Sequence, residues 1–223
     1  GKETQSKLLV EKLKAMGKKA VRVTFPNYES PTGKIVGGPY LGKKEISKCW
    51  FPEGAVNVDP KVTSLYYAAD RKYNEKEIRK YLEDDYFVIC DRYTSSNMAH
   101  QGSKIFDDNE RFNMYQWIDK LEYWLLGLPK ADKTIFLHVP YSYAFELKKN
   151  RISLDEHEKS EEHLKNSEVA YLELASYYNW VNINCIKDDK SHVGIPLFMR
   201  KKRGRKTGRK KEKDCKNIFI EFI

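Results

Sequence analysis

The chain opens with Gly1-Lys2-Glu3-Thr4-Gln5, residues of a type that can bind phosphate, directly before a predicted helix. A Gly-Lys pair at a helix N-terminus is typical of the second half of a phosphate loop. There the backbone amides and the helix dipole attract phosphate oxygens, while the lysine reaches the β- and γ-phosphates. The same dipeptide is also common where a helix begins without any ligand. Because no strand and no earlier glycine precede it in the sequence, we expect the sheet to lack its first strand, beside this site.

Two further segments carry side chains suited to a phosphorylated ligand. Asp91 and Arg92 directly follow an apolar run, and ligands of open parallel sheets collect beyond the carboxyl ends of strands. The arginine offers five donors to a phosphate, and the carboxylate can orient it or reach a metal ion. Tyr67 and Arg71 stand four residues apart on a predicted helix, so the ring could stack on a base whose carbonyl accepts from the guanidinium. The alternatives are a structural Asp–Arg pair and a core aromatic beside a surface ion pair.

Four short runs rich in β-branched and aromatic residues supply the strands that would position these groups. They span residues 20–25, 86–90, 134–139 and 181–186. Their near-continuous apolar character predicts burial on both faces, as in a parallel sheet covered by helices. The helices predicted between them are one closed by Gly17 and others over residues 60–71, 75–82, 108–125 and 160–178. This alternation predicts an α/β fold with helices on both faces of the sheet.

Composition excludes several classes of protein. With 223 residues the chain suits one large domain, and no apolar run approaches the length of about 20 residues needed to cross a bilayer, so we expect no membrane partner. Four cysteines without a C-x-x-C pair favour the cytoplasm and argue against a zinc site. Residues 200–213 hold ten basic residues and one acidic residue, so this segment accounts for the whole net charge of +9.

Two stretches break the alternation of strands and helices. Residues 37–57 are rich in Gly and Pro without a period, which predicts a loop. We expect residues 1–190 to form the domain and residues 191–223 to form a basic, disordered or atypical tail. Segment 200–213 could tether nucleic acid, act as a targeting patch or have no selected role. The apolar residues 218–223 could form a small strand or an exposed end.

Taken in order, the motifs resemble those of one family. These are GKxTQ at residue 1, Phe25-Pro26, YAADR at residues 67–71, DRYTSSNMAHQG at residues 91–102, and a lid-like region over about residues 148–160. The series is similar to that of the thymidylate kinases, P-loop enzymes that transfer the γ-phosphoryl group of ATP to dTMP. The resemblance covers about residues 1–190 and implies a P-loop NTPase-type sheet and a homodimer.

The resemblance assigns the phosphate contacts first. It implies that Lys2 and the backbone around it bind ATP, with Gly1, Glu3, Thr4 and Gln5 in the same segment. Arg92 would bind the dTMP phosphate and bridge toward the transferred group. Asp91 would support Arg92 and the Mg²⁺ that accompanies ATP. Arg151 would add a lid cation, beside Lys148 and Lys149.

The nucleoside contacts follow from the same resemblance. Tyr67 would stack on thymine and Arg71 would donate to it, which would favour thymine over cytosine because a donor facing the exocyclic amine of cytosine is left unpaired. The remaining lining residues would be Phe25, Ser96, Asn97 and Asn166.

One departure and two alternatives stay open at this point. Glu3 stands where a phosphate loop normally has the Ser or Thr hydroxyl that coordinates Mg²⁺, so it could bind metal or point outward. A deoxynucleoside kinase is the alternative enzyme. The alternative without catalysis is an impaired kinase-like protein whose basic tail, residues 200–213, binds nucleic acid.

Overall fold

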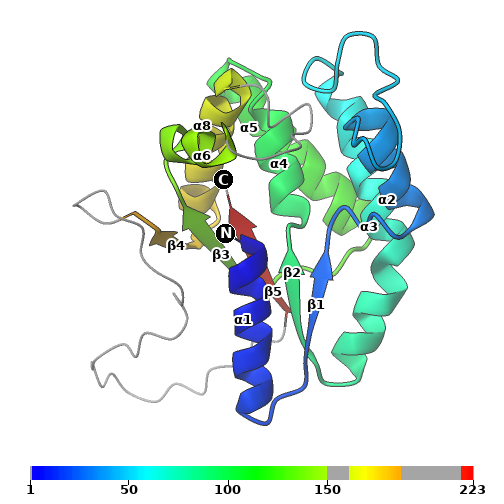
Figure 1. The fold of residues 1–223 in the computed structure, drawn as a ribbon, viewed down its shortest axis with the longest axis vertical. Coiled ribbons are helices and arrows are strands. Elements are labelled where there is room, and N and C mark those ends of the chain that lie inside the picture. Colours follow the sequence, from blue (N-terminus) through cyan, green and yellow to red (C-terminus); the bar gives the residue numbers. More distant parts are fainter. Residues whose placement is uncertain (1, 150–160, 187–216, 223) are drawn as a thin grey trace.

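The computed structural model describes residues 2–149, 161–186 and 217–222, and these form a sheet of five parallel strands with helices on both faces (Figure 1). The strand order is β1-β2-β5-β3-β4. The strands are β1 (Ala20–Thr24), β2 (Phe87–Asp91), β3 (Lys133–His138), β4 (Val181–Asn184) and β5 (Asn217–Phe222). The helical elements are α1 (Lys2–Ala15), α2 (Pro31–Ile35), η1 (Val36–Tyr40), α3 (Pro60–Glu83), α4 (Thr94–Gly102), α5 (Asp108–Asp119), η2 (Lys120–Leu125), α6 (Tyr141–Lys149) and α8 (Glu161–Tyr177).

The predicted strands and their parallel direction are confirmed. Strand β2 shows why its sequence is apolar throughout. Val88 and Cys90 pack against one face together with Ile78 of α3, whereas Ile89 packs against the other face with Val10 of α1. All three strand residues are completely buried. Alternate side chains therefore enter two separate cores, so neither face of the strand can be polar.

The helices predicted over residues 60–71 and 75–82 are one continuous helix, so the predicted break is wrong. The Asp59 side chain accepts hydrogen bonds from the backbone amides of Lys61 and Val62, which caps the N-terminus of α3 as expected. No Gly or Pro interrupts residues 61–83. Glu75 lies at the expected break and forms ion pairs with Lys72 and Arg79, one turn on either side, so it joins the two predicted segments.

The expectation that the sheet lacks a strand beside β2 is corrected by the last described residues of the chain. Residues 217–222, which were assigned to the basic tail, form β5 between β2 and β3. Val88 pairs with Asn217 on one side, and Lys133 pairs with Ile218 on the other. The domain therefore does not end at residue 190 but includes this strand. The basic segment 200–213 lies outside the described residues.

The loop predicted over residues 37–57 holds a short helical element at its start, η1, followed by chain without helix or strand. It is anchored by Tyr40, which is fully buried and donates a hydrogen bond from its hydroxyl to the carbonyl of Ala55. Among the helices of the described ranges, none has the length and apolar content that a transmembrane span requires.

Candidate active site

The site lies at the edge of the sheet where the parallel strands have their carboxyl ends. Asp91 is the last residue of β2, and α1 begins at the same edge (Figure 1). Arg22 of β1 joins these elements, because its Nη2 lies 2.5 Å from Oδ2 of Asp91 and its Nε lies 2.7 Å from Oγ of Ser6 in α1. The predicted partner of Asp91 was Arg92, so this part of the prediction is wrong. Arg22 was missed, although a charged residue inside an apolar strand is a usable signal.

Only one of the two carboxylate oxygens of Asp91 accepts a hydrogen bond in this arrangement. The side chain is 2% exposed, and its second oxygen, Oδ1, has no hydrogen-bond partner among the described residues. Buried polar atoms normally find a partner, so a lone carboxylate oxygen at a strand end is suited to a bound cation or a donor. The described part of the chain contains no group of three or more His, Cys, Asp or Glu side chains arranged around one point.

Arg92 follows Asp91 with a backbone φ of +65°. A residue other than glycine in this left-handed region costs about 1–3 kcal/mol, so the surrounding structure must hold the turn in place. The Nη1 atom of Arg92 lies 3.1 Å from Oγ of Ser96, 2.9 Å from Nε2 of His100 and 3.3 Å from the hydroxyl of Tyr171. The structure thus confirms that Arg92 stands at the strand end and places it beside Ser96, another predicted site residue.

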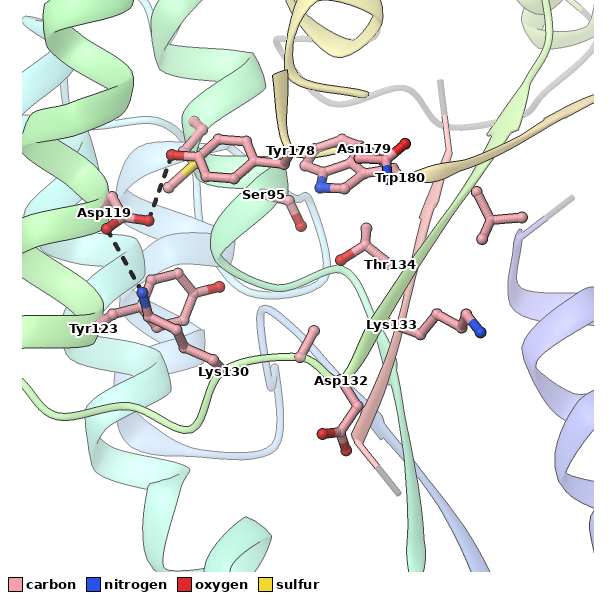
Figure 2. A pocket seen from close by; sticks show the side chains of 13 residues that line it. Ser95, Asp119, Tyr123, Lys130, Asp132, Lys133, Thr134, Tyr178, Asn179 and Trp180 are labelled. Carbon is pink, nitrogen blue, oxygen red and sulfur yellow. Dashed lines mark hydrogen bonds and ion pairs between the residues drawn. The ribbon is translucent and has the colours of Figure 1, made fainter. Parts of the chain in front are cut away.

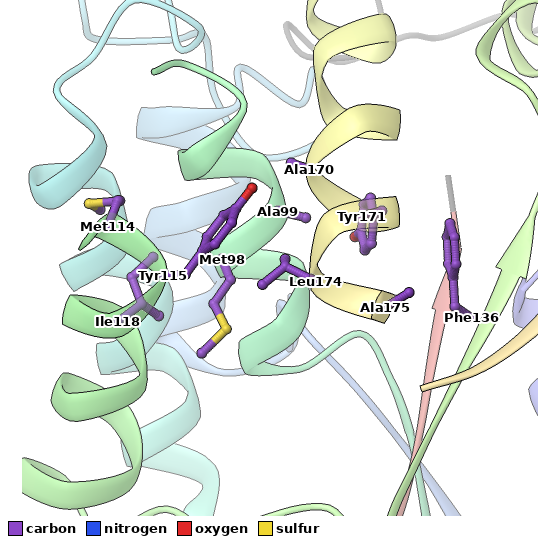
Figure 3. Close-up of a cluster of buried hydrophobic side chains, with 10 residues drawn as sticks. All are labelled: Met98, Ala99, Met114, Tyr115, Ile118, Phe136, Ala170, Tyr171, Leu174 and Ala175. Atoms are coloured by element: carbon purple, nitrogen blue, oxygen red, sulfur yellow. The ribbon is translucent and has the colours of Figure 1, made fainter. Parts of the chain in front are cut away.

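Tyr171 is a rigid support for this arginine. Its ring stacks on Phe136 of β3 with centroids 5.4 Å apart and an interplanar angle of 7°, and both rings are fully buried. Figure 3 shows Tyr171 on α8 facing Phe136, within the core formed by α4, α5 and α8. The hydroxyl of Tyr171 also lies 2.9 Å from Oγ of Ser96. Core packing on one side of the sheet therefore fixes polar atoms around Arg92.

His100 is held in one tautomer by its neighbours. Arginine can only donate, so Nε2 of His100 must accept from Arg92, and the ring proton must lie on Nδ1. That nitrogen faces Nε2 of His163 at 3.3 Å and Oγ of Ser167 at 3.4 Å, both on α8. The imidazole is therefore neutral and acts as an acceptor for the guanidinium. Sequence reasoning missed this role, because the sequence does not show how the turn at Arg92 directs its guanidinium toward His100.

The resemblance implies that the Arg92 guanidinium bridges toward the transferred phosphoryl group. We therefore expect the variant His100→Leu to lower kcat by about 10- to 100-fold, because the guanidinium loses its alignment with that group. The KM for ATP should stay unchanged. His100→Gln should restore most of the rate, since its amide oxygen can accept from Arg92. Steady-state kinetics of both variants would check this. Equal losses in the Leu and Gln variants would show that His100 does not position Arg92.

A buried ion pair lies between α3 and η2, behind the Arg92 turn. Nε and Nη2 of Arg71 lie 2.5 Å from Oε2 and Oε1 of Glu122, and both side chains are almost fully buried. Burial by itself would lower the pKa of Arg71, but the adjacent carboxylate of Glu122 outweighs it and raises that pKa, so the guanidinium stays charged. Glu122 also accepts from Oγ1 of Thr94 and Nδ2 of Asn97, each at 2.8 Å. Glu122 was missed by sequence reasoning.

The amide of Asn97 has a fixed direction. Its Nδ2 donates to Oε1 of Glu122 and to the carbonyl of Ser64, two groups that can only accept, so Oδ1 must point the other way. Oδ1 is buried and has no partner among the described residues. One helical turn further along α4, Gln101 is completely buried and neither of its amide atoms has a described partner. Gln101 was also missed, and its unsatisfied amide is visible only in three dimensions.

The other predicted residues are spread around this core. Phe25 is buried and packs edge-on against Tyr93 with centroids 5.6 Å apart. Tyr67 is half-buried on α3, one turn before Arg71, and packs edge-on against Tyr40 with centroids 5.9 Å apart. Asn166 is half-buried on α8. The structure thus brings Arg92 and Ser96 into one group of contacts, and Arg71 and Asn97 into a second group through Glu122. No described contact joins Asn166 to either group.

In the first turn of α1, some side chains are exposed to solvent and others are buried. Glu3 is exposed and forms an ion pair with Lys7 at 2.8 Å, so of the two alternatives considered for Glu3 the structure shows the outward one. Thr4 is exposed, whereas Gln5 is 5% exposed and its Oε1 has no described partner. The predicted site residues Gly1 and Arg151, together with the side chain of Lys2, lie outside what the structure describes.

A separate cavity of about 280 Å³ lies at the opposite edge of the sheet. It is lined by Lys133 and Thr134 at the start of β3 and by Val181 at the start of β4. Figure 2 shows that Tyr178 and Lys130 both point to Asp119 on its wall. The amino ends of parallel strands are not where such sheets bind nucleotides, so we do not place the active site in this cavity.

A parallel sheet with a helix N-terminus, a buried carboxylate and an arginine at one edge defines the class of P-loop nucleotide kinases. The sequence model of the thymidylate kinase family matches residues 1–193, and the chain belongs to this family. It is 32% identical to a probable thymidylate kinase of Methanocaldococcus jannaschii over 86% of this chain and 85% of that protein. It is also 32% identical to the thymidylate kinase of Plasmodium falciparum, over 84% and 78% of the two chains. The solved thymidylate kinase of Candida albicans shares the fold, with a TM-score of 0.58 at 24% identity over 85% of this chain and 81% of that one.

Proposed function

We propose that this protein phosphorylates dTMP to dTDP with ATP as the phosphoryl donor. The observation that supports this best is that Glu122 holds both the buried donor Arg71 and the amide of Asn97, whose Oδ1 is left as a fixed acceptor, because a donor and an acceptor suit the edge of a thymine base. Membership of the thymidylate kinase family supports the same reaction.

Recognition of the base follows from which atoms can donate. Thymine presents an acceptor at O4 and a donor at N3–H, whereas cytosine presents an exocyclic amine and an acceptor at N3. Two nitrogens of Arg71 are engaged by Glu122, which leaves Nη1 to donate to O4. Oδ1 of Asn97 accepts from N3–H. With cytosine, the donor Arg71 would face the exocyclic amine, which is also a donor, and the acceptor Oδ1 of Asn97 would face N3, which is also an acceptor. Each buried group left unpaired in this way costs about 1–3 kcal/mol. The amide of Gln101 can turn either way, so it adds affinity without choosing between the bases.

The chemistry needs alignment and neutralisation of charge, because phosphoryl transfer passes through a loose transition state. The first-turn amides of α1 hold phosphate oxygens of ATP, with Lys2 beside them. Arg92 binds the phosphate of dTMP. It also contacts the γ-phosphoryl group that is transferred from ATP to dTMP. Oδ1 of Asp91, which is buried without a described partner at the carboxyl end of β2, would hold Mg²⁺ directly or through water. When bound, Mg²⁺ neutralises charge on the β- and γ-phosphates.

A coupled assay of ADP release with dTMP, dUMP, dCMP and thymidine tests this function. We expect turnover with dTMP and kcat/KM for dCMP lower by at least 100-fold, since two buried groups lose their partners. Turnover with thymidine but not dTMP would favour a deoxynucleoside kinase. A well-folded sample that releases no ADP with any acceptor would contradict a kinase function altogether.

Three expectations from the sequence stay predictions. These are the homodimer, the cytoplasmic location and nucleic-acid binding by residues 200–213. The last of them concerns residues that the structure does not describe.

A further inference from the structure

A second buried carboxylate on α3, that of Asp70, gathers donors from a segment far away in the sequence. The residue is 1% exposed. Its Oδ2 accepts from the backbone amide of Asn27 at 2.9 Å. Its Oδ1 accepts from the hydroxyls of Ser30 at 3.0 Å and Thr32 at 2.9 Å, and from Nδ2 of Asn74 at 3.0 Å. A charge is kept in the interior only where hydrogen bonds satisfy it, so this carboxylate and its donors hold one another in place.

The donors belong to the β1–α2 loop (residues 25–30) and to the start of α2. Asn74, one turn after Asp70, adds a further bond, because its Oδ1 accepts from Nδ2 of Asn27 at 2.8 Å. Oγ of Ser30 accepts from the backbone amide of Gly33 at 3.0 Å and caps α2. A Cβ atom on residue 33 would overlap the carbonyl of Asn27, so the loop and α2 are in direct backbone contact. The loop is therefore fixed on two sides, by α2 and by the Asp70 carboxylate.

The β1–α2 loop borders the edge of the sheet where Arg92 stands. The backbone amide of Phe25 donates to the carbonyl of Asp91 at 3.1 Å, and the Phe25 ring packs on Tyr93, so the loop contacts both chain neighbours of Arg92. A cavity of about 340 Å³ is lined by residues 26–29 of the loop and by Arg22, the partner of Asp91. A shift of the loop would therefore change the shape of this edge.

Helix α3 carries Asp70 and Arg71 side by side, and the two buried side chains contact different parts of the fold. Arg71 pairs with Glu122, which also accepts from Asn97 of α4. Asp70 holds the β1–α2 loop instead. We propose that Asp70 is a positioning residue for the acceptor, a deoxynucleoside monophosphate: it fixes the β1–α2 loop as one wall of the acceptor site without contacting the ligand. The inference rests on the proposed function and extends it to a residue behind the site.

Kinetics of two variants test the proposal. Asp70→Ala leaves the four donors without their acceptor, so we expect the KM for dTMP to rise by about tenfold or more, since a loosened wall weakens binding in the ground state and the transition state alike. The KM for ATP should stay within about twofold. Asp70→Asn keeps the size and one acceptor oxygen but turns a donor toward the loop, so its KM for dTMP should lie between those of the original protein and Asp70→Ala.

The matched control is Glu75→Gln. Glu75 is also a buried carboxylate of α3, but its ion pairs are with Lys72 and Arg79. Loss of these pairs should lower the melting temperature and leave the KM for dTMP within about twofold. The control therefore separates a general loss of stability in α3 from a loss of loop position.

Hydrogen exchange without substrate measures the loop directly. The amides of Asn27 and Gly33 donate to Oδ2 of Asp70 and Oγ of Ser30, so both should exchange slowly in the original protein and faster in Asp70→Ala. Equal exchange rates for Asn27 in the two proteins would overturn the proposal.

The outcomes also separate this proposal from the proposed function. An original protein that phosphorylates dTMP, together with an unchanged KM for dTMP in folded Asp70→Ala and Asp70→Asn, would overturn the role of Asp70 and leave the function standing. Equal rises in the KM for ATP and for dTMP would overturn it too, because they indicate damage to the whole fold. An original protein that releases no ADP with dTMP would contradict the function, and with it the acceptor that we assign to this wall.

Discussion

Replacing Arg92 with alanine should lower kcat by 10³-fold or more while the protein stays folded. The guanidinium stands at the strand end and contacts Ser96, His100 and Tyr171. We propose that the phosphate of dTMP meets the transferred phosphoryl group there. Loss of an arginine that stabilises the charge of a phosphoryl-transfer transition state has an effect of this size. Steady-state kinetics with ATP and dTMP measure it, and circular dichroism checks the fold.

Two further variants make the Arg92 experiment specific. Arg92→Lys keeps the charge but loses the planar fork, so we expect an intermediate loss of rate. Arg79 is a matched control, because it is an arginine of α3 with a half-exposed side chain that pairs with Glu75. Arg79→Ala should leave kcat within about twofold of the original, as is usual for an exposed ion pair. A loss below tenfold for Arg92→Ala would show that Arg92 is structural.

Replacing Glu122 with alanine should destabilise the protein by about 3–5 kcal/mol, because it leaves the guanidinium of Arg71 as an uncompensated buried charge. It would also remove the acceptor that Thr94 and Asn97 share. Chemical denaturation measures the change in the free energy of unfolding. The matched control is Glu3→Gln, which breaks the exposed pair with Lys7 and should cost below 1 kcal/mol.

A double variant separates stability from recognition at the same pair. Arg71→Met combined with Glu122→Leu replaces two paired charges with apolar groups of similar size, so it should recover most of the lost stability. It should still lose selectivity for dTMP over dCMP, because the donor to O4 is gone and the direction of the Asn97 amide is no longer fixed. A double variant that keeps its selectivity would show that the pair serves the fold alone.

In our proposal, base selectivity depends on residues that contact the base and on a residue that orients them. Glu122 does not contact a ligand in our proposal. Its hydrogen bonds with two nitrogens of Arg71 and with the amide nitrogen of Asn97 fix the orientation of both side chains. A buried carboxylate is costly unless it is fully bonded, and here it accepts from three side chains. The site therefore gains a fixed pattern of donors and acceptors from a group behind it.

The amino-acid sequence by itself determined the local features of this protein. Apolar runs without alternation identified four strands, because a strand buried on both faces has no polar positions. Asp59 and Asp107 marked helix starts, since each side chain accepts the amide hydrogens of the next turn. The Asp91-Arg92 pair was found at a strand end, where position in the sequence already implies position at the edge of the sheet.

Only the tertiary structure decided which distant residues meet. Arg22 pairs with Asp91, and Glu122 directs Arg71 and Asn97, because each of these contacts joins elements that are far apart along the chain. His100 lies only eight residues after Arg92, but its contact with the guanidinium depends on the turn that leads into α4. The place of β5 is the largest such difference. An apolar segment of six residues can pair with any open strand edge or remain an exposed end, so its sequence predicted neither its structure nor its neighbours. Its backbone pairs with both β2 and β3, and this pairing decides its position in the sheet.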